Sequence, residues 1–170
     1  MTTASWSRRW HLPDASATRA AGQALGRALL DLNTHGPLLV TLQGELGAGK
    51  TTLVSGLLSA LGHVGPVRSP TYTLIEPYDL AGRPLYHLDL YRLTDPLQLE
   101  ELGVRDLLQP GAILLVEWPE RAGDLLANPD LKVQLAYSAD GAEGRKLELR
   151  PGTESLQQLV DSLAFSVESE

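Results

Sequence analysis

A glycine-rich segment in the first third of the chain contains the residues whose types and spacing point most clearly to chemistry. Gly44, Gly49, Lys50 and Thr51 match the pattern G-x-x-x-x-G-K-[ST] in full. In such loops the glycines let consecutive backbone N–H groups point inward at a triphosphate, the lysine reaches the β- and γ-phosphates, and the hydroxyl binds Mg²⁺. Gly47 adds conformational freedom to the turn. The segment therefore predicts a loop that binds nucleotide phosphates.

Magnesium at such a loop needs a second protein anchor, which is usually a carboxylate at the end of a neighbouring strand. Glu117 directly follows the apolar residues 113–116. Because sites in parallel sheets lie at the carboxyl ends of the strands, we predict that Glu117 is this anchor and not a solvated glutamate. Trp118 comes next and either packs against its neighbours or helps to shape the site.

Two further polar positions leave alternatives open. Asp89 lies in an apolar-rich segment, where an unpaired carboxylate is costly to bury, so it either pairs with a base such as Arg92 or faces the magnesium–phosphate site. Residues 69–73 carry hydroxyl groups beside a proline, a pattern that fits both a polar turn and a switch loop that meets the γ-phosphate. His87 is interpreted as a packing residue, and no cluster of His, Asp and Glu in the sequence indicates a zinc site.

The residues around the loop predict the elements that must position it. Residues 38–42 form a nearly continuous apolar run, which is typical of a strand buried on both faces of a parallel sheet. Residues 51–61 are expected to form a helix that ends at Gly62 and directs its positive end at the bound anion. A strand, a glycine loop and a helix in this order are the context that the motif requires.

The whole pattern predicts a single α/β domain over residues 1–170, with a P-loop NTPase-type sheet, flanking helices and antiparallel strands within a mixed sheet. Pro77 favours the edge of the sheet for its strand, and Asp14 or Ser16 is expected to cap a helix over residues 17–32. The other expected elements are strands at residues 5–11, 74–78, 85–91, 112–117, 131–137 and 146–150, turns at 79–83 and 138–144, and helices at 96–103 and 155–163.

Composition narrows the class of protein. The chain has 170 residues, no cysteine and a formal net charge of −7. This composition excludes a disulfide framework and thiolate metal sites, and it argues against a broad basic surface for nucleic acid. The N-terminal segment lacks a signal-peptide pattern, and the apolar runs are too short to cross a membrane. We expect a cytoplasmic protein with no membrane partner, which reaches RNA only through another protein.

Four sequence blocks together resemble the signature blocks of the TsaE (YjeE) family and fall in the family's order. They are GELGAGKTT at 44–52, SPTYTL at 69–74, HLDLYRL at 87–93 and VEWPE at 116–120, and the similarity covers roughly residues 10–140. The resemblance implies the bacterial ATPase subunit needed for the N6-threonylcarbamoyladenosine (t6A) modification at position 37 of ANN-decoding tRNAs. It further implies that the protein acts on a TsaD–TsaB-like complex, that TsaC-type enzymes supply threonylcarbamoyl-adenylate, and that contact with tRNA is indirect.

The same resemblance implies ATP and Mg²⁺ as cofactors. Lys50, Asp89 and Glu117 would serve hydrolysis, and residues 69–73 would form the first switch. The metal ligands would be Thr51 and Glu117. Around residues 12–14, which lie near the base in this family, the match is loose, and adenine contacts are not assigned. The implied cofactor contacts are Gly44, Gly47, Ala48, Gly49, Lys50, Thr51, Thr52, Ser69, Thr71 and Trp118.

Three other functions fit parts of the sequence. A small-molecule or nucleotide kinase would use the same loop, but such enzymes usually need an arginine-bearing lid, and the arginines here are scattered. A GTPase-like switch protein is disfavoured because the sequence lacks an Asn-Lys-x-Asp segment that reads guanine. A regulator that binds nucleotide and turns over only in a complex overlaps with the ATPase hypothesis, since we expect slow hydrolysis until partners complete the site.

Overall fold

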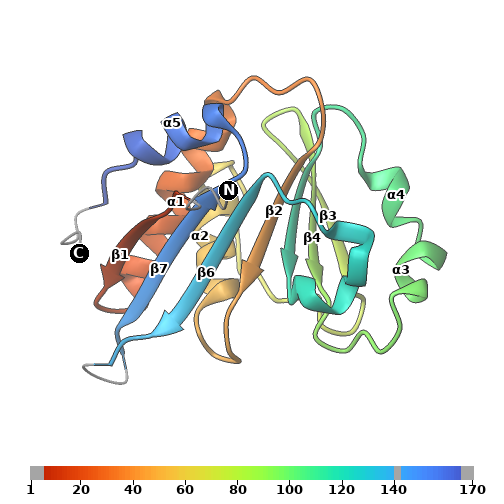
Figure 1. Ribbon diagram of the computed structural model, residues 1–170, viewed down its shortest axis with the longest axis horizontal. Coiled ribbons are helices and arrows are strands. Elements are labelled where there is room, and N and C mark those ends of the chain that lie inside the picture. The colour runs from red at the N-terminus through yellow and green to blue at the C-terminus, as the bar shows by residue number, and fades with distance from the viewer. Residues whose placement is uncertain (1–5, 140–142, 166–170) are drawn as a thin grey trace, which may run out of the picture.

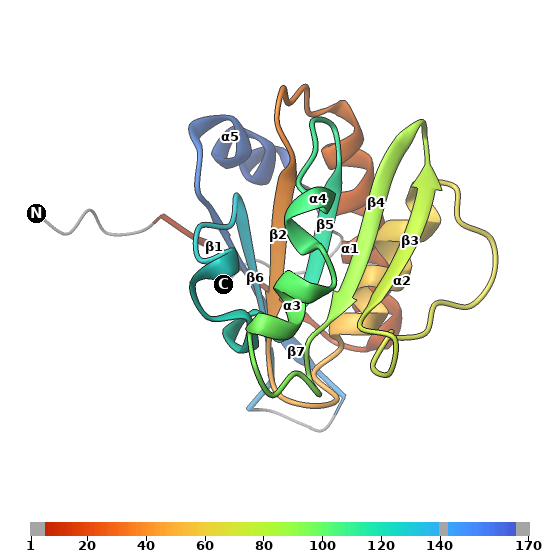
Figure 2. The same ribbon diagram turned by 90° about the vertical axis from the view of Figure 1, so that its right-hand side faces the viewer.

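The computed structural model describes residues 6–139 and 143–165, which build a seven-stranded mixed sheet with helices against both faces (Figure 1, Figure 2). The strand order is β1-β7-β6-β2-β5-β4-β3. The strands are β1 (Arg8–Leu12), β2 (Leu38–Gln43), β3 (Ile75–Leu80), β4 (Arg83–Asp89), β5 (Ile113–Glu117), β6 (Leu131–Tyr137) and β7 (Arg145–Pro151). The helices are α1 (Ala15–Asp31), α2 (Lys50–Ala60), α3 (Leu97–Glu101), α4 (Val104–Leu107), the 3₁₀ helix η1 (Pro119–Leu126) and α5 (Glu154–Ser162).

The middle of the sheet is parallel, and its strands are buried as their apolar sequences predict. β2 lies between β5 and β6 and runs parallel to both, and β4 runs parallel to β5. Residues 38–42 of β2 and all of β5 are buried, which confirms the predicted central strands. The register pairs Asp89 at the end of β4 with Glu117 at the end of β5. Both carboxylates therefore lie at the same edge of the sheet.

Antiparallel pairs complete the sheet and confirm the predicted mixed architecture. β3 and β4 join through Ala81 and Gly82, whose φ angles of 53° and 72° suit a tight hairpin turn. The predicted turn at residues 79–83 is therefore too wide, because strand pairing continues up to these two residues. β3 is an edge strand, and it holds Pro77 as predicted. β7 pairs antiparallel with both β6 and β1.

Close packing of α1 against α2 places the start of both helices beside the glycine-rich loop. A Cβ atom on Gly22 of α1 would lie 2.0 Å from the carbonyl oxygen of Leu53, and one on Gly56 of α2 would lie 2.0 Å from that of Arg19. These distances leave no room for any side chain at either crossing. The backbones of the two helices are therefore in direct contact.

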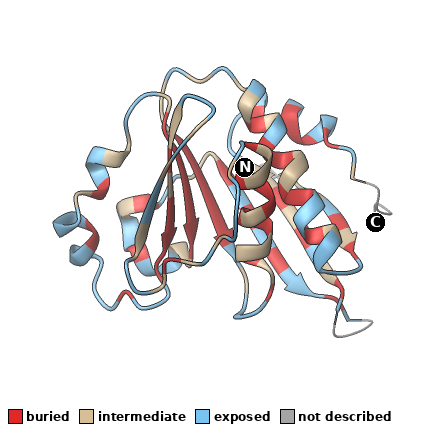
Figure 3. Cartoon of the chain, turned by 180° about the vertical axis from the view of Figure 1, so that it is seen from behind, coloured by how far each residue is buried: buried red, intermediate tan, exposed pale blue. Residues whose placement is uncertain are grey.

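The sheet separates two groups of buried apolar side chains, and Figure 3 shows the strands at the middle of the sheet in the colour of buried residues. One group lies between the sheet and helices α1, α2 and α5. The other lies between the central strands and the segments α3, α4 and η1. The central strands are thus covered on both faces, whereas β6 alternates between buried and exposed residues.

Predicted boundaries near the N-terminus shift by a few residues. β1 begins at Arg8, and residue 5, where we expected the strand to start, lies outside the described residues. Of the two predicted caps of α1, Asp14 is the N-cap, and its side chain accepts a hydrogen bond from Ala17 N at 2.7 Å. Residues 1–5, 140–142 and 166–170, which belong to the predicted domain and in part to the predicted 138–144 turn, are also outside the described residues.

The segment after β4 departs most from prediction. The helix expected at residues 96–103 is present as α3, which is shorter and ends at Glu101. Gly103 with φ 73° then begins a separate short helix, α4, which was not predicted. η1 was not predicted, because Trp118 with φ 57° and a kink at Gly123 interrupt any helical periodicity. Within the described part of the chain, the helices lack the combined length and apolar character needed to span a bilayer.

Candidate functional site

The glycine-rich loop curls between the end of β2 and the start of α2 through residues that need positive φ. Gly47 has φ 78°, and a Cβ atom there would lie 2.7 Å from the Tyr137 hydroxyl oxygen. Gly49 has φ 105° and is the N-cap of α2, for which the described residues supply no side-chain cap. The amide groups of the first turn of α2 are therefore left for a ligand, and an anion is the ligand that a helix N-terminus favours.

Lys50 places a cation at the base of this loop. Its side chain is buried, and its Nζ donates to the carbonyl oxygens of Gly44 at 2.6 Å and Glu45 at 2.9 Å. The same Nζ lies 4.3 Å from the centre of the Trp118 ring. Burial lowers the pKa of Lys50 from its ordinary value, and Glu117 is the foremost of the carboxylates that oppose this shift. An incoming anion would favour the charged form of the lysine further.

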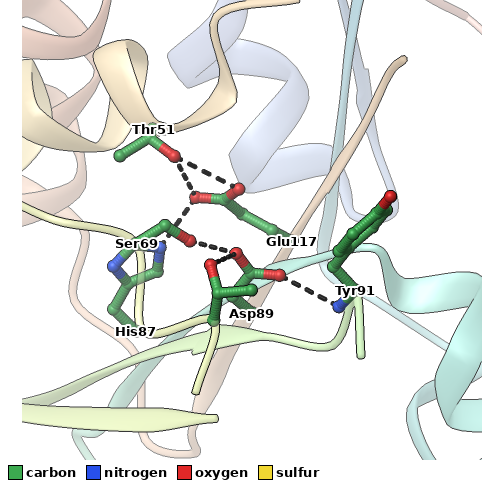
Figure 4. Close-up of polar contacts among 7 residues, drawn as sticks. Thr51, Ser69, His87, Asp89, Tyr91 and Glu117 are labelled. Carbon is green, nitrogen blue, oxygen red and sulfur yellow. Dashed lines mark hydrogen bonds and ion pairs between the residues drawn. The ribbon is translucent and has the colours of Figure 1, made fainter. Parts of the chain in front are cut away.

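Thr51 and Glu117 meet across the gap between α2 and β5 (Figure 4). The Thr51 hydroxyl donates to Glu117 Oε1 at 3.1 Å, with Oε2 at 3.4 Å. His87 Nε2 lies 2.8 Å from the same Oε1. The prediction that His87 is a packing residue is incomplete, because the ring is buried but contacts the site carboxylate. His87 precedes Asp89 by two residues in β4, and this strand period is the signal that would have placed both on one face.

Asp89 is held by the segment that was predicted as either a polar turn or a switch loop. Its Oδ2 accepts hydrogen bonds from the hydroxyls of Ser69 and Thr71, the latter at 3.2 Å, and its Oδ1 accepts from Tyr91 N at 2.9 Å. Arg92, the alternative partner, instead lies over the Tyr72 ring at 4.3 Å. Asp89 therefore faces the glycine-rich loop together with residues 69–71.

A cavity of about 310 Å³ brings most of the predicted site residues together. Its lining consists of Leu46, Gly47, Gly49, Lys50, Thr51, Thr52, Ser69, Thr71, Asp89, Tyr91, Glu117 and Trp118. Two predicted contacts are absent from that lining. The carbonyl oxygen of Gly44 accepts a hydrogen bond from Lys50, and Ala48 is fully buried with its N–H bonded to Glu45 O at 3.0 Å.

A second cavity of about 490 Å³ adjoins the first through Gly47, Gly49 and Thr52, which line both. Its other lining residues are Asp14, Ala15, Ser16, Thr18, Glu143 and Arg145. It is open and lined by both polar and apolar groups, so the two cavities together form an elongated site that runs from the start of α1 to the ends of β4 and β5.

Residues from the β6–β7 hairpin hold the loop from the other side, and sequence reasoning missed them. Arg145 Nε donates to Ala48 O at 3.1 Å, and its NH2 group donates to Gly47 O at 3.2 Å. The Tyr137 hydroxyl donates to Leu46 O at 2.8 Å. These contacts join positions more than ninety residues apart, so no local pattern in the sequence announces them.

The protein oxygens at the site suit a hard divalent cation that also binds a ligand. Among the described residues, no group of three or more His, Cys, Asp and Glu side chains could hold a metal ion by itself. Thr51 and Glu117 offer oxygens 3.1 Å apart. Neighbouring ligands of Mg²⁺ at about 2.1 Å are separated by about 3 Å, and Mg²⁺ usually takes only one or two protein ligands with water and phosphate. The pair fits this pattern.

The sequence is similar to a known family and to its members over most of their length. The family model described as threonylcarbamoyl adenosine biosynthesis protein TsaE matches residues 12–147. A tRNA threonylcarbamoyladenosine biosynthesis protein TsaE from Haemophilus influenzae is 42% identical over 156 residues, which cover 92% of this chain and 96% of that protein. The protein of the same description from Synechocystis is 46% identical over 123 residues, with 70% and 74% covered.

A comparison of folds agrees with the comparison of sequences. The crystal structure of Bacillus subtilis YdiB superposes on this chain with a TM-score of 0.67 and 27% sequence identity, and it covers 92% of this chain and 93% of that one. The predicted P-loop NTPase-type architecture is confirmed by this similarity together with the mixed sheet. This chain therefore belongs to the TsaE family of threonylcarbamoyladenosine biosynthesis proteins.

Proposed function

We propose that this protein is a magnesium-dependent ATPase that acts as the ATP-hydrolysing subunit of tRNA t6A biosynthesis. The observation that carries the proposal is the cavity in which the loop glycines, Lys50 and Thr51 face the two strand-end carboxylates Asp89 and Glu117. A phosphate-binding loop alone would bind the nucleotide without hydrolysing it. Carboxylates on neighbouring strands supply the groups that a metal-assisted hydrolysis needs.

The triphosphate would lie over the N-terminus of α2. There the free amides of the first turn and the positive end of the helix favour negative charge. Lys50 would exchange its bonds to the Gly44 and Glu45 carbonyls for bonds to the β- and γ-phosphates. This exchange costs little, because the lysine side chain already lies at the wall of the cavity.

Mg²⁺ would be held by the Thr51 hydroxyl and Glu117, and when bound it would neutralise charge that develops on the phosphates. Asp89 fixes the hydroxyls of Ser69 and Thr71 at the cavity wall. Each hydroxyl would exchange its bond to Asp89 for one to a γ-phosphate, which is how a switch loop responds to the triphosphate state. Trp118 would shield the lysine and the phosphates from solvent.

The nucleoside would occupy the adjoining 490 Å³ cavity between α1 and the loop. This cavity shares Gly47, Gly49 and Thr52 with the phosphate site, so a nucleotide can span both without leaving the surface of the protein. Hydrolysis is favoured over transfer to an acceptor, because arginine is absent from the described lining of the phosphate cavity. Kinases generally clamp the transferred phosphoryl group with such cations.

The partner would be a TsaD–TsaB-like complex, and contact with tRNA would be indirect. The net charge of −7 supports a protein partner, since a chain so acidic does not hold nucleic acid by charge alone. The test is a reconstituted t6A reaction with and without this protein, in parallel with phosphate release. We expect t6A formation to require the protein, and slow ATP hydrolysis to accelerate when the TsaD–TsaB pair is added. An unchanged ATPase rate at saturating concentrations of the pair would contradict the proposal.

A further inference from the structure

His87 occupies a position in β4 that packing alone does not explain. It is fully buried, and its Nε2 lies 2.8 Å from Glu117 Oε1 (Figure 4). Its Nδ1 is buried without a hydrogen-bond partner among the described residues. A polar ring that leaves one nitrogen unsatisfied is costly to bury, so the contact with Glu117 must contribute something that an apolar side chain could not.

The direction of this hydrogen bond follows from the chemistry of its partner. An ionised carboxylate only accepts, so Nε2 carries the hydrogen and donates to Oε1 of Glu117. The parallel register sets His87 beside Leu115, two residues before the Asp89–Glu117 pair. The backbone that carries this donor is therefore held by strand pairing inside the sheet.

Glu117 accepts hydrogen bonds from two donors, and only one of them would also bind the metal ion. The Thr51 hydroxyl also donates to it, at 3.1 Å, but its oxygen is one of the two atoms that would bind Mg²⁺. The Glu117 side chain is only 4% exposed, and His87 and Thr51 are the side-chain donors that the described residues bring to it. A Thr51 hydroxyl that binds a cation can still donate its hydrogen, but the cation then sets its position. His87 instead holds the carboxylate from the side of the sheet, independently of the cation.

We propose that His87 is a positioning residue that holds Oε1 of Glu117 and thereby presents the carboxylate to Mg²⁺ beside Thr51. The inference rests on the proposed function, because it concerns the metal site of that same nucleotide cavity. Hydrogen-bonded partners of metal ligands are worth about 10–100-fold in metal affinity or activity in other proteins. Loss of the His87 donor should therefore weaken the magnesium-dependent part of nucleotide binding and leave the remainder intact.

Two amide substitutions separate this role from simple packing. In His87→Gln the amide nitrogen lies the same number of bonds from Cα as Nε2 and can still donate to Glu117. In His87→Asn the nitrogen is one bond closer to the backbone and falls short. Both variants place a polar amide at the same buried position, so we expect similar losses of stability in the two. Thermal unfolding of each variant measures that loss.

The assay is titration calorimetry with ATP, once with Mg²⁺ and once with EDTA. For His87→Gln we expect the ratio of the two affinities to stay within about 3-fold of wild type. For His87→Asn we expect the ratio to fall about 10–100-fold, with affinity in EDTA unchanged. In a Glu117→Ala background, where the bond no longer exists, His87→Asn should leave the ratio unaltered.

Three results would overturn the inference. They are a wild-type ratio in His87→Asn, equal losses of affinity with Mg²⁺ and with EDTA in that variant, and equal losses of the ratio in both amide variants. If His87→Asn is too unstable to titrate, the ratio in His87→Gln still decides the matter, because a loss of 10-fold or more there contradicts a role as donor. If the wild type itself binds ATP equally with and without Mg²⁺, the proposed function fails first, and the inference fails with it.

Discussion

Replacing Gly56 by alanine should have two opposing effects on the free energy of unfolding, a gain in helix propensity and a steric clash. In an isolated helix, Gly to Ala stabilises by about 1 kcal/mol, because glycine loses more backbone freedom on folding. Here the added Cβ would lie 2.0 Å from the backbone carbonyl oxygen of Arg19 in α1. A relaxed contact between carbon and oxygen needs about 3.3 Å, so the helices would have to separate by about 1.3 Å.

We expect the steric clash to outweigh the gain in helix propensity. Overpacking typically costs about 1–3 kcal/mol, and a backbone carbonyl cannot rotate away as a side chain can, which places this site at the upper end of that range. After subtraction of the helix-propensity gain, we expect Gly56→Ala to lower the free energy of unfolding by about 2 kcal/mol. For a chain of this size that corresponds to a decrease in Tm of about 4–8 °C.

Thermal and chemical denaturation measure the effect, and Gly36→Ala is the matched control. A Cβ atom on Gly36 would have nothing within 4 Å, and the residue has no positive φ, so the same substitution there should change stability by less than about 0.5 kcal/mol. Gly22→Ala, which meets Leu53 O at 2.0 Å, should behave like Gly56→Ala. A Gly56→Ala protein as stable as wild type would refute the close helix contact.

Two other predictions concern charge. Lys50→Ala removes charge-assisted hydrogen bonds to phosphate and should weaken ATP binding about 10–100-fold by calorimetry, while Lys132→Ala on the exposed sheet surface should leave affinity unchanged. Burial raises the pKa of Glu148, but hydrogen bonds led by that from Arg150 outweigh it and lower the pKa from 4.5 to about 2. The resulting stability, about 1–3 kcal/mol, is present above pH 4.5 and is lost as pH falls toward 2. Glu148→Gln should therefore be less stable than wild type at pH 7 and should approach it near pH 2, and a constant difference in urea denaturation across that range would contradict this origin.

The parts of the site that could be predicted from sequence are those encoded locally. The β2–loop–α2 unit is a continuous apolar run, a glycine motif and a helix, and all three lie within about twenty residues. Glu117 could be placed because it ends an apolar strand, and the parallel register then brings it beside Asp89. In both cases short-range patterns and sheet geometry suffice.

The rest depends on contacts between distant segments. Asp89 had two possible partners in the sequence, and only the path of residues 69–71 over the end of β4 decides between them. Arg145 contacts the loop from a strand nearly one hundred residues away. η1 forms around a left-handed Trp118, which costs backbone energy that only the surrounding structure offsets. The periodicity of a sequence cannot predict such long-range contacts.

The most direct measurement of the central claim is calorimetric titration of the wild-type protein with ATP and with AMP in the presence of Mg²⁺. Amides, lysine and a metal-held hydroxyl converge on the β- and γ-phosphates in this account, so ATP should bind at least about 100-fold more tightly than AMP. Equal affinities for the two nucleotides, or no detectable binding of ATP by folded protein, would contradict the account.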